Sequence, residues 1–166
     1  MASRLFFDPV VALRTAPLVS STCTLFYAFS QDFFLRIFNH ADLRKENKSA
    51  VSPYFKIFFC RGLPIVLSLL SATTSTTVAN LYTQPSSLRN KGAYSWYMAA
   101  AIFSASHILF VPFVPGSVKR LVENEKDTDA NDTLDEWLSV NALRGLTVDL
   151  VAWVACVVAV GKSLVA

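Results

Sequence analysis

Residues 135–163 read DEWLSVNALRGLTVDLVAWVACVVAVGKS, a stretch that opens with acidic and amide side chains and ends in an apolar run. Every residue from Leu150 to Val160 is apolar, and the stretch is long enough to cross a bilayer core of ~30 Å as a helix. Its first half carries Asn141 and Arg144, and such groups are costly at membrane depth unless they face protein or water. The stretch therefore predicts a membrane-spanning helix with a polar face turned toward the inside of a bundle.

The rest of the sequence has the same layout of apolar blocks separated by polar segments. The apolar fraction of 53% is only slightly above that of soluble proteins, but no charged residue occurs between Gly62 and Leu88. An amphipathic helix of a soluble bundle would carry charges every few residues. We therefore predict an all-α fold, a single-domain four-helix transmembrane bundle with up-down-up-down topology in a lipid bilayer. Its expected spans are residues 15–35, 54–81, 94–114 and 137–161.

The charge balance and the cysteine content disfavour several classes of function. The formal net charge is only +3 and no basic run alternates with aromatic residues, so we expect no nucleic-acid binding. The three cysteines form no C-x-x-C motif, and the two histidines belong to no cluster with metal-ligand spacing. We therefore expect no metal site and no redox motif. The five glycines form no nucleotide-binding loop, and we predict that the protein uses no cofactor.

Lysine and arginine residues are distributed unevenly between the two sides of the predicted bundle. The loops after the first and third spans, with the adjoining helix ends, hold ten of them, against five on the other side. The positive-inside rule therefore predicts that these two loops face the cytosol. Glycosylation sequons at Asn47 and Asn131 lie in the same loops and argue for the opposite orientation. Short sequons often arise by chance, so the charge count has more weight.

Polar residues of all four predicted spans lie at a similar depth, within one or two helical turns of the ends that join the charged loops. These residues are Gln31, Asp32, Arg61, His107, Asn141 and Arg144. The opposite leaflet is expected to consist mostly of Val, Ala, Leu and Phe, with Ser and Thr. Because scattered polar residues would not align in this way, we interpret the aligned layer as a candidate site.

Four members of this layer also have a purely structural interpretation. Asp32 and Arg61 can instead reach out to lipid headgroups. His107 can bond a neighbouring hydroxyl group. The nearest candidate counter-charges of Arg144 are Asp32 and Asp149, and such a pair can be structural.

Residues of the last two predicted spans resemble a known family. A histidine precedes a proline-marked exit from the third span, and the motif W-x3-N-x2-R opens the fourth; the residues are His107, Pro112, Pro115, Trp137, Asn141 and Arg144. With four spans in so short a chain, this pattern is similar to that of the small integral-membrane anthrone oxygenase-like proteins of fungal aromatic polyketide pathways.

The resemblance implies a cofactor-free oxygenase of the endoplasmic reticulum membrane that converts an anthrone, a hydrophobic aromatic small molecule, to a quinone with O2. His107 is the expected base, with Asp32 as the alternative, because a base can turn an anthrone into an electron-rich enolate. Arg144 and Asn141 are expected to stabilise the oxyanion. The residues expected to bind the substrate are Trp137, Phe33, Phe34, Gln31 and Arg61.

Two other functions stay open on the sequence alone. The same acid–base residues would serve an isomerase or cyclase that acts on a hydrophobic natural product. Alternatively, the protein is a non-catalytic membrane adaptor in which Arg144 and Asp149 form a structural ion pair. Oxygen uptake with a candidate anthrone would distinguish the oxygenase from the other membrane enzymes.

Overall fold

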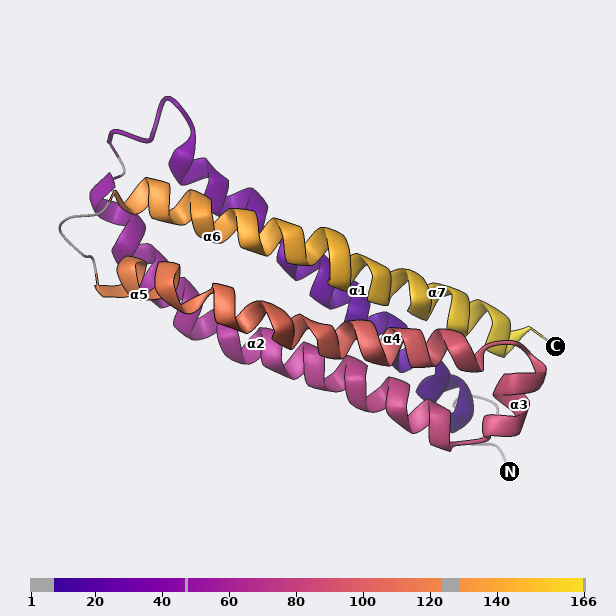
Figure 1. The fold of residues 1–166 in the computed structure, drawn as a ribbon. Helices are drawn as coiled ribbons and strands as arrows, with labels where there is room; N and C mark the ends of the chain where they lie inside the picture. The colour runs from indigo at the N-terminus through magenta and orange to yellow at the C-terminus, as the bar shows by residue number, and fades with distance from the viewer. Residues whose placement is uncertain (1–7, 47, 124–128, 166) are drawn as a thin grey trace.

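The computed structural model describes residues 8–46, 48–123 and 129–165, and within these ranges every regular element is a helix. Four helical stretches are long and apolar enough to cross a membrane. They run up and down in turn along one common direction, as Figure 1 shows. The predicted all-α four-helix bundle is therefore confirmed, and the chain has the architecture of an integral membrane protein.

The first stretch is α1 (Pro9–Arg36) and the second is α2 (Lys48–Tyr82). The third is α4 (Tyr94–Ser106), which continues into the 3₁₀-helix η3 (His107–Phe113). The fourth consists of α6 (Ala130–Arg144), the π-helical turn η4 (Gly145–Asp149) and α7 (Leu150–Leu164). The connecting segments contain η2 (Ile37–Asn39), α3 (Pro85–Asn90) and α5 (Pro115–Glu123). Both α1 and α4 pack against α2 and α7, so the four stretches close into a ring.

Small side chains bring α4 and α7 close together. Ala100 on α4 packs in one buried cluster with Ala155 and Cys156 on α7, and Ala93 and Ala159 belong to a second cluster nearby. In a bilayer the lipid chains are as apolar as the side chains, so helices associate through close packing, which small residues favour. These small residues therefore let α4 and α7 pack closely in the half of the bundle away from the charged loops.

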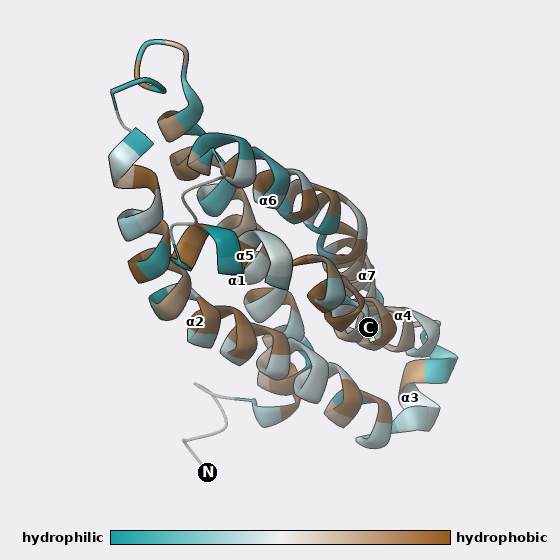
Figure 2. Ribbon diagram, turned by 60° about the vertical axis from the view of Figure 1, so that its left-hand side comes forward, coloured by the Kyte–Doolittle hydropathy of each residue, from teal (hydrophilic) through white to brown (hydrophobic). Residues whose placement is uncertain are grey.

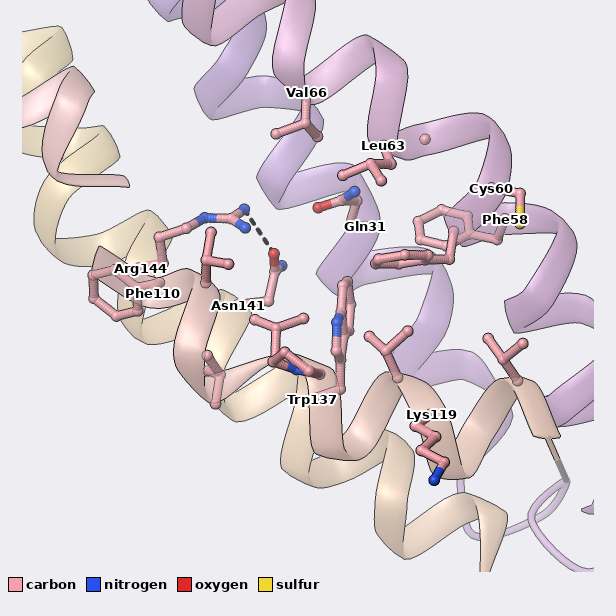
Figure 3. A pocket seen from close by; sticks show the side chains of 18 of the residues that line it. Gln31, Phe58, Cys60, Leu63, Val66, Phe110, Lys119, Trp137, Asn141 and Arg144 are labelled. Atoms are coloured by element: carbon pink, nitrogen blue, oxygen red, sulfur yellow. Dashed lines mark hydrogen bonds between the residues drawn. The ribbon is translucent and has the colours of Figure 1, made fainter. Parts of the chain in front are cut away.

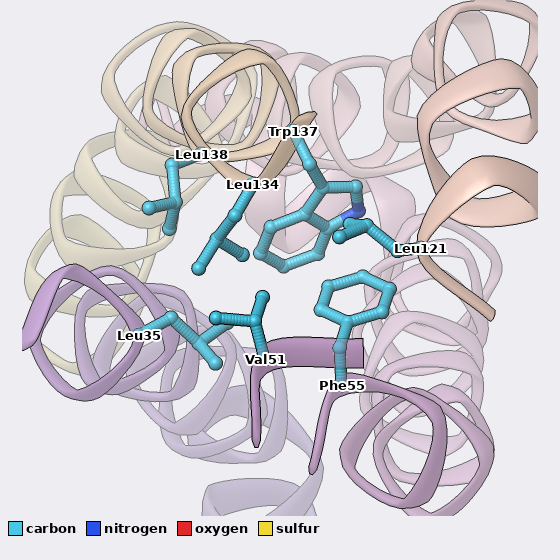
Figure 4. Close-up of a cluster of buried hydrophobic side chains, with 7 residues drawn as sticks. All are labelled: Leu35, Val51, Phe55, Leu121, Leu134, Trp137 and Leu138. Carbon is cyan, nitrogen blue, oxygen red and sulfur yellow. The ribbon is translucent and has the colours of Figure 1, made fainter. Parts of the chain in front are cut away.

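Large side chains fill the bundle at the end that joins the charged loops, and Figure 4 shows this buried cluster. Its members come from α1, α2, α5 and α6: Leu35, Val51, Phe55, Leu121, Leu134, Trp137 and Leu138. The ring of Phe55 meets Trp137 edge-on, with 5.3 Å between the ring centroids, a favourable geometry for an aromatic pair. The cluster fixes the position of α6 and, through Trp137, one wall of the cavity described below.

Ion pairs connect the start of α6 to the loop after α1 and to the first residue of α2. The Arg44 guanidinium lies 3.1 Å from the Asp135 carboxylate, and Lys48 Nζ lies 2.9 Å from Asp129. Asp129 caps α6 by accepting hydrogen bonds from the backbone N–H groups of the first turn. The hydrogen bond from Lys48 lowers the pKa of the Asp129 carboxyl. Hydrophilic residues gather at the ends of the bundle, as Figure 2 shows.

The sequon at Asn131 is buried in the structure. Its side chain donates hydrogen bonds to the Phe38 carbonyl at 3.1 Å and to Asn39 Oδ1 at 2.6 Å, and the residue is 1% exposed. A glycan on this amide would replace one of the two donated hydrogens and would have no room at a position that is buried. The structure therefore removes one of the two arguments against the orientation that the charge count predicts; the other sequon residue, Asn47, lies outside the described residues.

The half of the bundle opposite the charged loops contains three buried polar residues in addition to the expected Ser and Thr. The Tyr97 hydroxyl donates to the Arg14 carbonyl at 2.9 Å, and Asn80 donates to the Leu13 carbonyl at 2.7 Å. Arg14, Asn80 and Tyr97 are all buried. The predicted first span began at residue 15, whereas α1 begins at Pro9 and so carries Arg14 inside the helix rather than at its flank.

Replacing Phe55 by Ala should destabilise the bundle. The ring is 0% exposed, and emptying a buried aromatic site costs about 3–5 kcal/mol because the neighbours relax only in part. Phe34→Ala is the matched control, because Phe34 is 57% exposed on the surface and its removal leaves no cavity. Thermal unfolding of the detergent-solubilised variants checks this, and equal melting temperatures for the two variants would contradict the assigned packing.

Candidate functional site

A π-helical turn brings an arginine and an aspartate together inside the fourth stretch. Arg144 and Asp149 are five residues apart, and in a regular α-helix this spacing turns two side chains about 140° away from each other. In η4 the Leu150 N–H bonds to the Gly145 carbonyl, five residues back. The wider turn brings residues five apart closer to the same face. Arg144 Nε therefore reaches Asp149 Oδ2 at 3.2 Å.

The Asp149 carboxylate is shared between two partners on different helical stretches. Its second oxygen, Oδ1, lies 3.0 Å from Nδ1 of His107. The side chains of Asp149, His107 and Arg144 are 3%, 9% and 12% exposed. A buried carboxylate is costly unless it is paired and hydrogen-bonded, and here each of its oxygens has a partner. We refer to these three residues as the buried triad.

The position of His107 follows from the way the third stretch changes its winding. Pro112 lacks an N–H group and its ring would clash with the carbonyl four residues earlier in an α-helix, and residues His107–Phe113 form a 3₁₀-helix. His107 is the first residue of this segment. Because a carboxylate accepts hydrogen bonds, the neutral imidazole that bonds Asp149 carries its proton on Nδ1 and its lone pair on Nε2. Such a nitrogen can accept a proton from a ligand.

Asn141 extends the polar group by one step and connects it to α1. The Arg144 guanidinium donates to Asn141 Oδ1 at 2.7 Å through its NH2 nitrogen. Asn141 Nδ2 in turn donates to the Ala28 carbonyl of α1 at 3.4 Å. These two bonds fix the orientation of the amide. Together with its bond to Asp149, the bond to Asn141 holds the Arg144 guanidinium between an aspartate and an asparagine of the same helical stretch.

A cavity of about 600 Å³ lies beside these residues, between α2, η3, α5 and α6, with Gln31 of α1 at its inner wall. Most of its lining is apolar, and its polar groups include His107, Asn141 and Arg144. Figure 3 shows Arg144, Asn141 and Trp137 along the α6 side and Gln31 and Leu63 across from them. An apolar cavity with a few convergent polar groups is the usual form of a small-molecule site.

A second hollow of about 490 Å³ lies on the other side of α6, between α1, η4 and α7. Asn141 lines both cavities, while Asp32 lines only this second one. The Asp32 carboxylate forms an ion pair with Arg36, one turn along α1, at 2.7 Å. The structure therefore separates Asp32 from His107 and Arg144, two of the residues with which it was predicted to form a site.

The structure brings five of the nine predicted site residues to the first cavity and places the other four elsewhere. The five at the cavity are Gln31, His107, Trp137, Asn141 and Arg144. Phe33 and Phe34 are exposed, with 56% and 57% of their surface accessible, and Arg61 is also exposed. None of these three lines either cavity. Asp149, which the sequence suggested only as one of two counter-charges for Arg144, links Arg144 to His107.

The chain is similar to several fungal proteins over nearly its whole length. It is 24% identical over 156 residues to the epoxidase pydX of an Acremonium species, a match that covers 94% of this chain and 96% of that protein. It is also 24% identical over 152 residues to the epoxidase gkaX of Penicillium citrinum, with 92% and 94% coverage. These names specify an epoxidase and do not mention an anthrone.

A third relative carries the name of a biosynthetic cluster rather than of a reaction. The oxaleimides biosynthesis cluster protein N of Penicillium oxalicum is 26% identical over 157 residues, which is 92% of this chain and 89% of that protein. No protein-family model and no solved structure matches the chain. The similarity therefore connects the chain to fungal secondary metabolism through sequence alone.

Removing one charge of the Arg144–Asp149 pair should lower the stability of the protein more than removing both. Asp149→Leu leaves the Arg144 charge unpaired in a nearly dry site, which costs about 3–5 kcal/mol. The double variant Asp149→Leu with Arg144→Met should recover most of that loss, because neither charge remains. Thermal unfolding of the three forms checks this.

The exposed pair Arg36–Asp32 supplies the control for that experiment. Asp32→Leu should cost no more than about 1 kcal/mol, because a solvent-accessible ion pair contributes little. Equal destabilisation by Asp32→Leu and Asp149→Leu would contradict the burial of the triad.

Proposed function

We propose that the chain is a membrane-embedded oxygenase that acts on an apolar small molecule of fungal secondary metabolism. The observation that carries this proposal is the His107–Asp149 pair at the wall of an apolar cavity, with Arg144 bound to the same carboxylate. The similarity to proteins named epoxidases supports the oxidative part of the proposal. The apolar lining supports a substrate that partitions into membranes, as does the bilayer setting, in which O2 is also soluble.

The first step of the proposed reaction is the removal of a proton by His107. Nε2 takes the proton from an acidic C–H or O–H group of the substrate, and Asp149 stabilises the resulting imidazolium through Nδ1. The substrate becomes an anion, and Arg144 and Asn141 hold the oxygen that carries the charge. Because the site has a low dielectric, these preoriented groups act more strongly than they would in water.

The electron-rich anion then reacts with O2, and two overall reactions are consistent with this step. In the oxidation of an anthrone, a CH2 group becomes a carbonyl, one oxygen atom enters the quinone, and the other leaves as water. All four electrons come from the substrate, so this reaction requires no bound cofactor. It is the reaction that the resemblance to anthrone oxygenase-like proteins implies.

Epoxidation is the second candidate reaction, and the names of the relatives favour it. One oxygen atom of O2 is added across a carbon–carbon double bond and the other becomes water. This balance needs two electrons beyond those of the double bond, which come from oxidation of the ionised part of the same substrate or from an added two-electron donor. Assays of alkene substrates should therefore be run with and without such a donor.

Different walls of the cavity contact different parts of the substrate. Trp137 and the apolar residues of η3 and α5 contact the hydrocarbon part, and His107 and Arg144 of the buried triad contact the reacting end. Asp32 is the alternative base, but its position in the second cavity and its pairing with Arg36 favour His107. Residence in the endoplasmic reticulum membrane is part of the proposal.

Removing the proposed base should abolish most of the turnover. We expect His107→Ala to lower the rate about 10²–10⁴-fold, the usual contribution of a positioned general base, whereas Asp32→Asn should stay within a few-fold of wild type. The measurement is O2 uptake with product identification, using purified protein, chelator, and panels of anthrones and polyunsaturated alkenes. Wild-type turnover by His107→Ala with loss of turnover in Asp32→Asn would assign the base to Asp32.

A further inference from the structure

One polar side chain at the cavity, that of Gln31, has no role in the proposed reaction. Gln31 projects from α1 and lines the cavity. The residue is only 5% exposed, and its Oε1 atom is buried with no hydrogen-bond partner among the described residues. A buried acceptor left without a donor costs about 1–3 kcal/mol. An apolar residue at this position would avoid that cost, so the amide calls for an explanation.

The surroundings of Gln31 show why the amide is held at the cavity. It lies against Gly62 of α2: a Cβ atom at that position would lie 4.0 Å from Gln31 Nε2 and 2.7 Å from the Tyr27 hydroxyl. The glycine therefore leaves room for the Tyr27 hydroxyl, and Gln31 lies at ordinary contact distance from the same position. Figure 3 shows the Gln31 carboxamide across the cavity from Arg144 and Asn141, with its oxygen toward their side.

The two polar walls of the cavity differ in hydrogen-bonding character, because a guanidinium has no acceptor whereas the Gln31 amide has both a donor and an acceptor. On the α6 side the Arg144 guanidinium can only donate, and it suits an anionic or carbonyl oxygen. On the α1 side the unpartnered atom is an acceptor, which suits an O–H or N–H group. The outermost torsion of a glutamine side chain has a broad, shallow energy profile, so this oxygen can turn into the cavity at low cost.

We propose that Gln31 selects substrates carrying a hydrogen-bond donor, an O–H or N–H group, on the part of the molecule opposite the ionised oxygen. This inference rests on the proposed function, in which Arg144 and His107 hold the reacting end, and it adds the second polar point of the substrate. The substrate is thus an apolar molecule with two polar ends of different character. A hydrocarbon with a single ionisable oxygen leaves Gln31 Oε1 unsatisfied and binds more weakly.

The test compares paired probes that differ only in the proposed donor. The probes are 1,5-, 2,6- and 2,7-dihydroxynaphthalene, each with its monomethyl ether, so that one hydroxyl remains for the triad and the other is present or blocked. Calorimetry with full-length protein in nanodiscs gives the dissociation constant of each. For each protein we take the dissociation constant of the ether divided by that of the diol. Dividing the wild-type value by the value for a Gln31 variant removes the difference in lipid partitioning between the two probes.

For at least one pair, we expect the ether-to-diol ratio of dissociation constants to be five- to tenfold larger for wild type than for Gln31→Leu. This is the usual contribution of one hydrogen bond. Gln31→Glu keeps an acceptor oxygen and should retain the preference, whereas Phe34→Leu, a change away from the cavity, should match wild type. Gln31→Leu should melt no lower than wild type, because it removes an unsatisfied buried acceptor.

Three results would overturn the proposal: equal or undetectable binding of diol and ether by wild type in all pairs, an unchanged preference in Gln31→Leu, or a clear fall in its melting temperature. The last result would show that the protein itself satisfies the amide. Turnover by His107→Ala is a separate readout. If that variant keeps full activity while the diol preference still depends on Gln31, the base assignment fails and the role of Gln31 stands.

Discussion

The sharing of the Asp149 carboxylate between Arg144 and His107 is the interaction on which the rest of the site depends. A lone carboxylate at this depth would cost several kcal/mol, and neither partner comes from ordinary α-helical geometry. Arg144 reaches Asp149 because η4 winds as a π-helix, and His107 stands where α4 tightens into η3. Two irregular helical segments thus meet at one carboxylate, and the apolar cavity opens beside them. The regular parts of the bundle hold these segments in place.

The sequence predicted the bundle because its apolar blocks have the length of membrane spans. The spacing i, i+4, i+7 places Trp137, Asn141 and Arg144 on one helix face, and all three line the same cavity. The π-helical turn was not predictable in the same way, because the sequence of residues 145–149 contains no residue that forces it. Without that turn Asp149 and Arg144 belong to different faces, so Asp149 remained only one of two possible counter-charges.

The residues around Gln31 show that residues at the same depth in a helix can point in different directions. Gln31, Asp32 and Phe33 lie at nearly the same height in the membrane, but consecutive residues of a helix are turned about 100° from each other. Gln31 and Leu35 share the buried face of α1, so Asp32 and Phe33 point elsewhere. Depth can therefore be estimated from the position of a residue within an apolar block. Direction depends on which face packs inward, and α1 has no strong periodicity that shows this.

The shared carboxylate also couples the two charges that the proposed reaction creates. When His107 accepts a proton, the imidazolium attracts Oδ1 of Asp149 more strongly. The single negative charge of Asp149 then neutralises Arg144 less completely. At the same moment the substrate gains a negative oxygen, which suits the guanidinium. Charge separation in a low-dielectric cavity is expensive, so a triad that carries a compensating charge on each side lowers its cost. The buried ion pair, which contributes little to stability by itself, is thereby suited to proton transfer within a membrane.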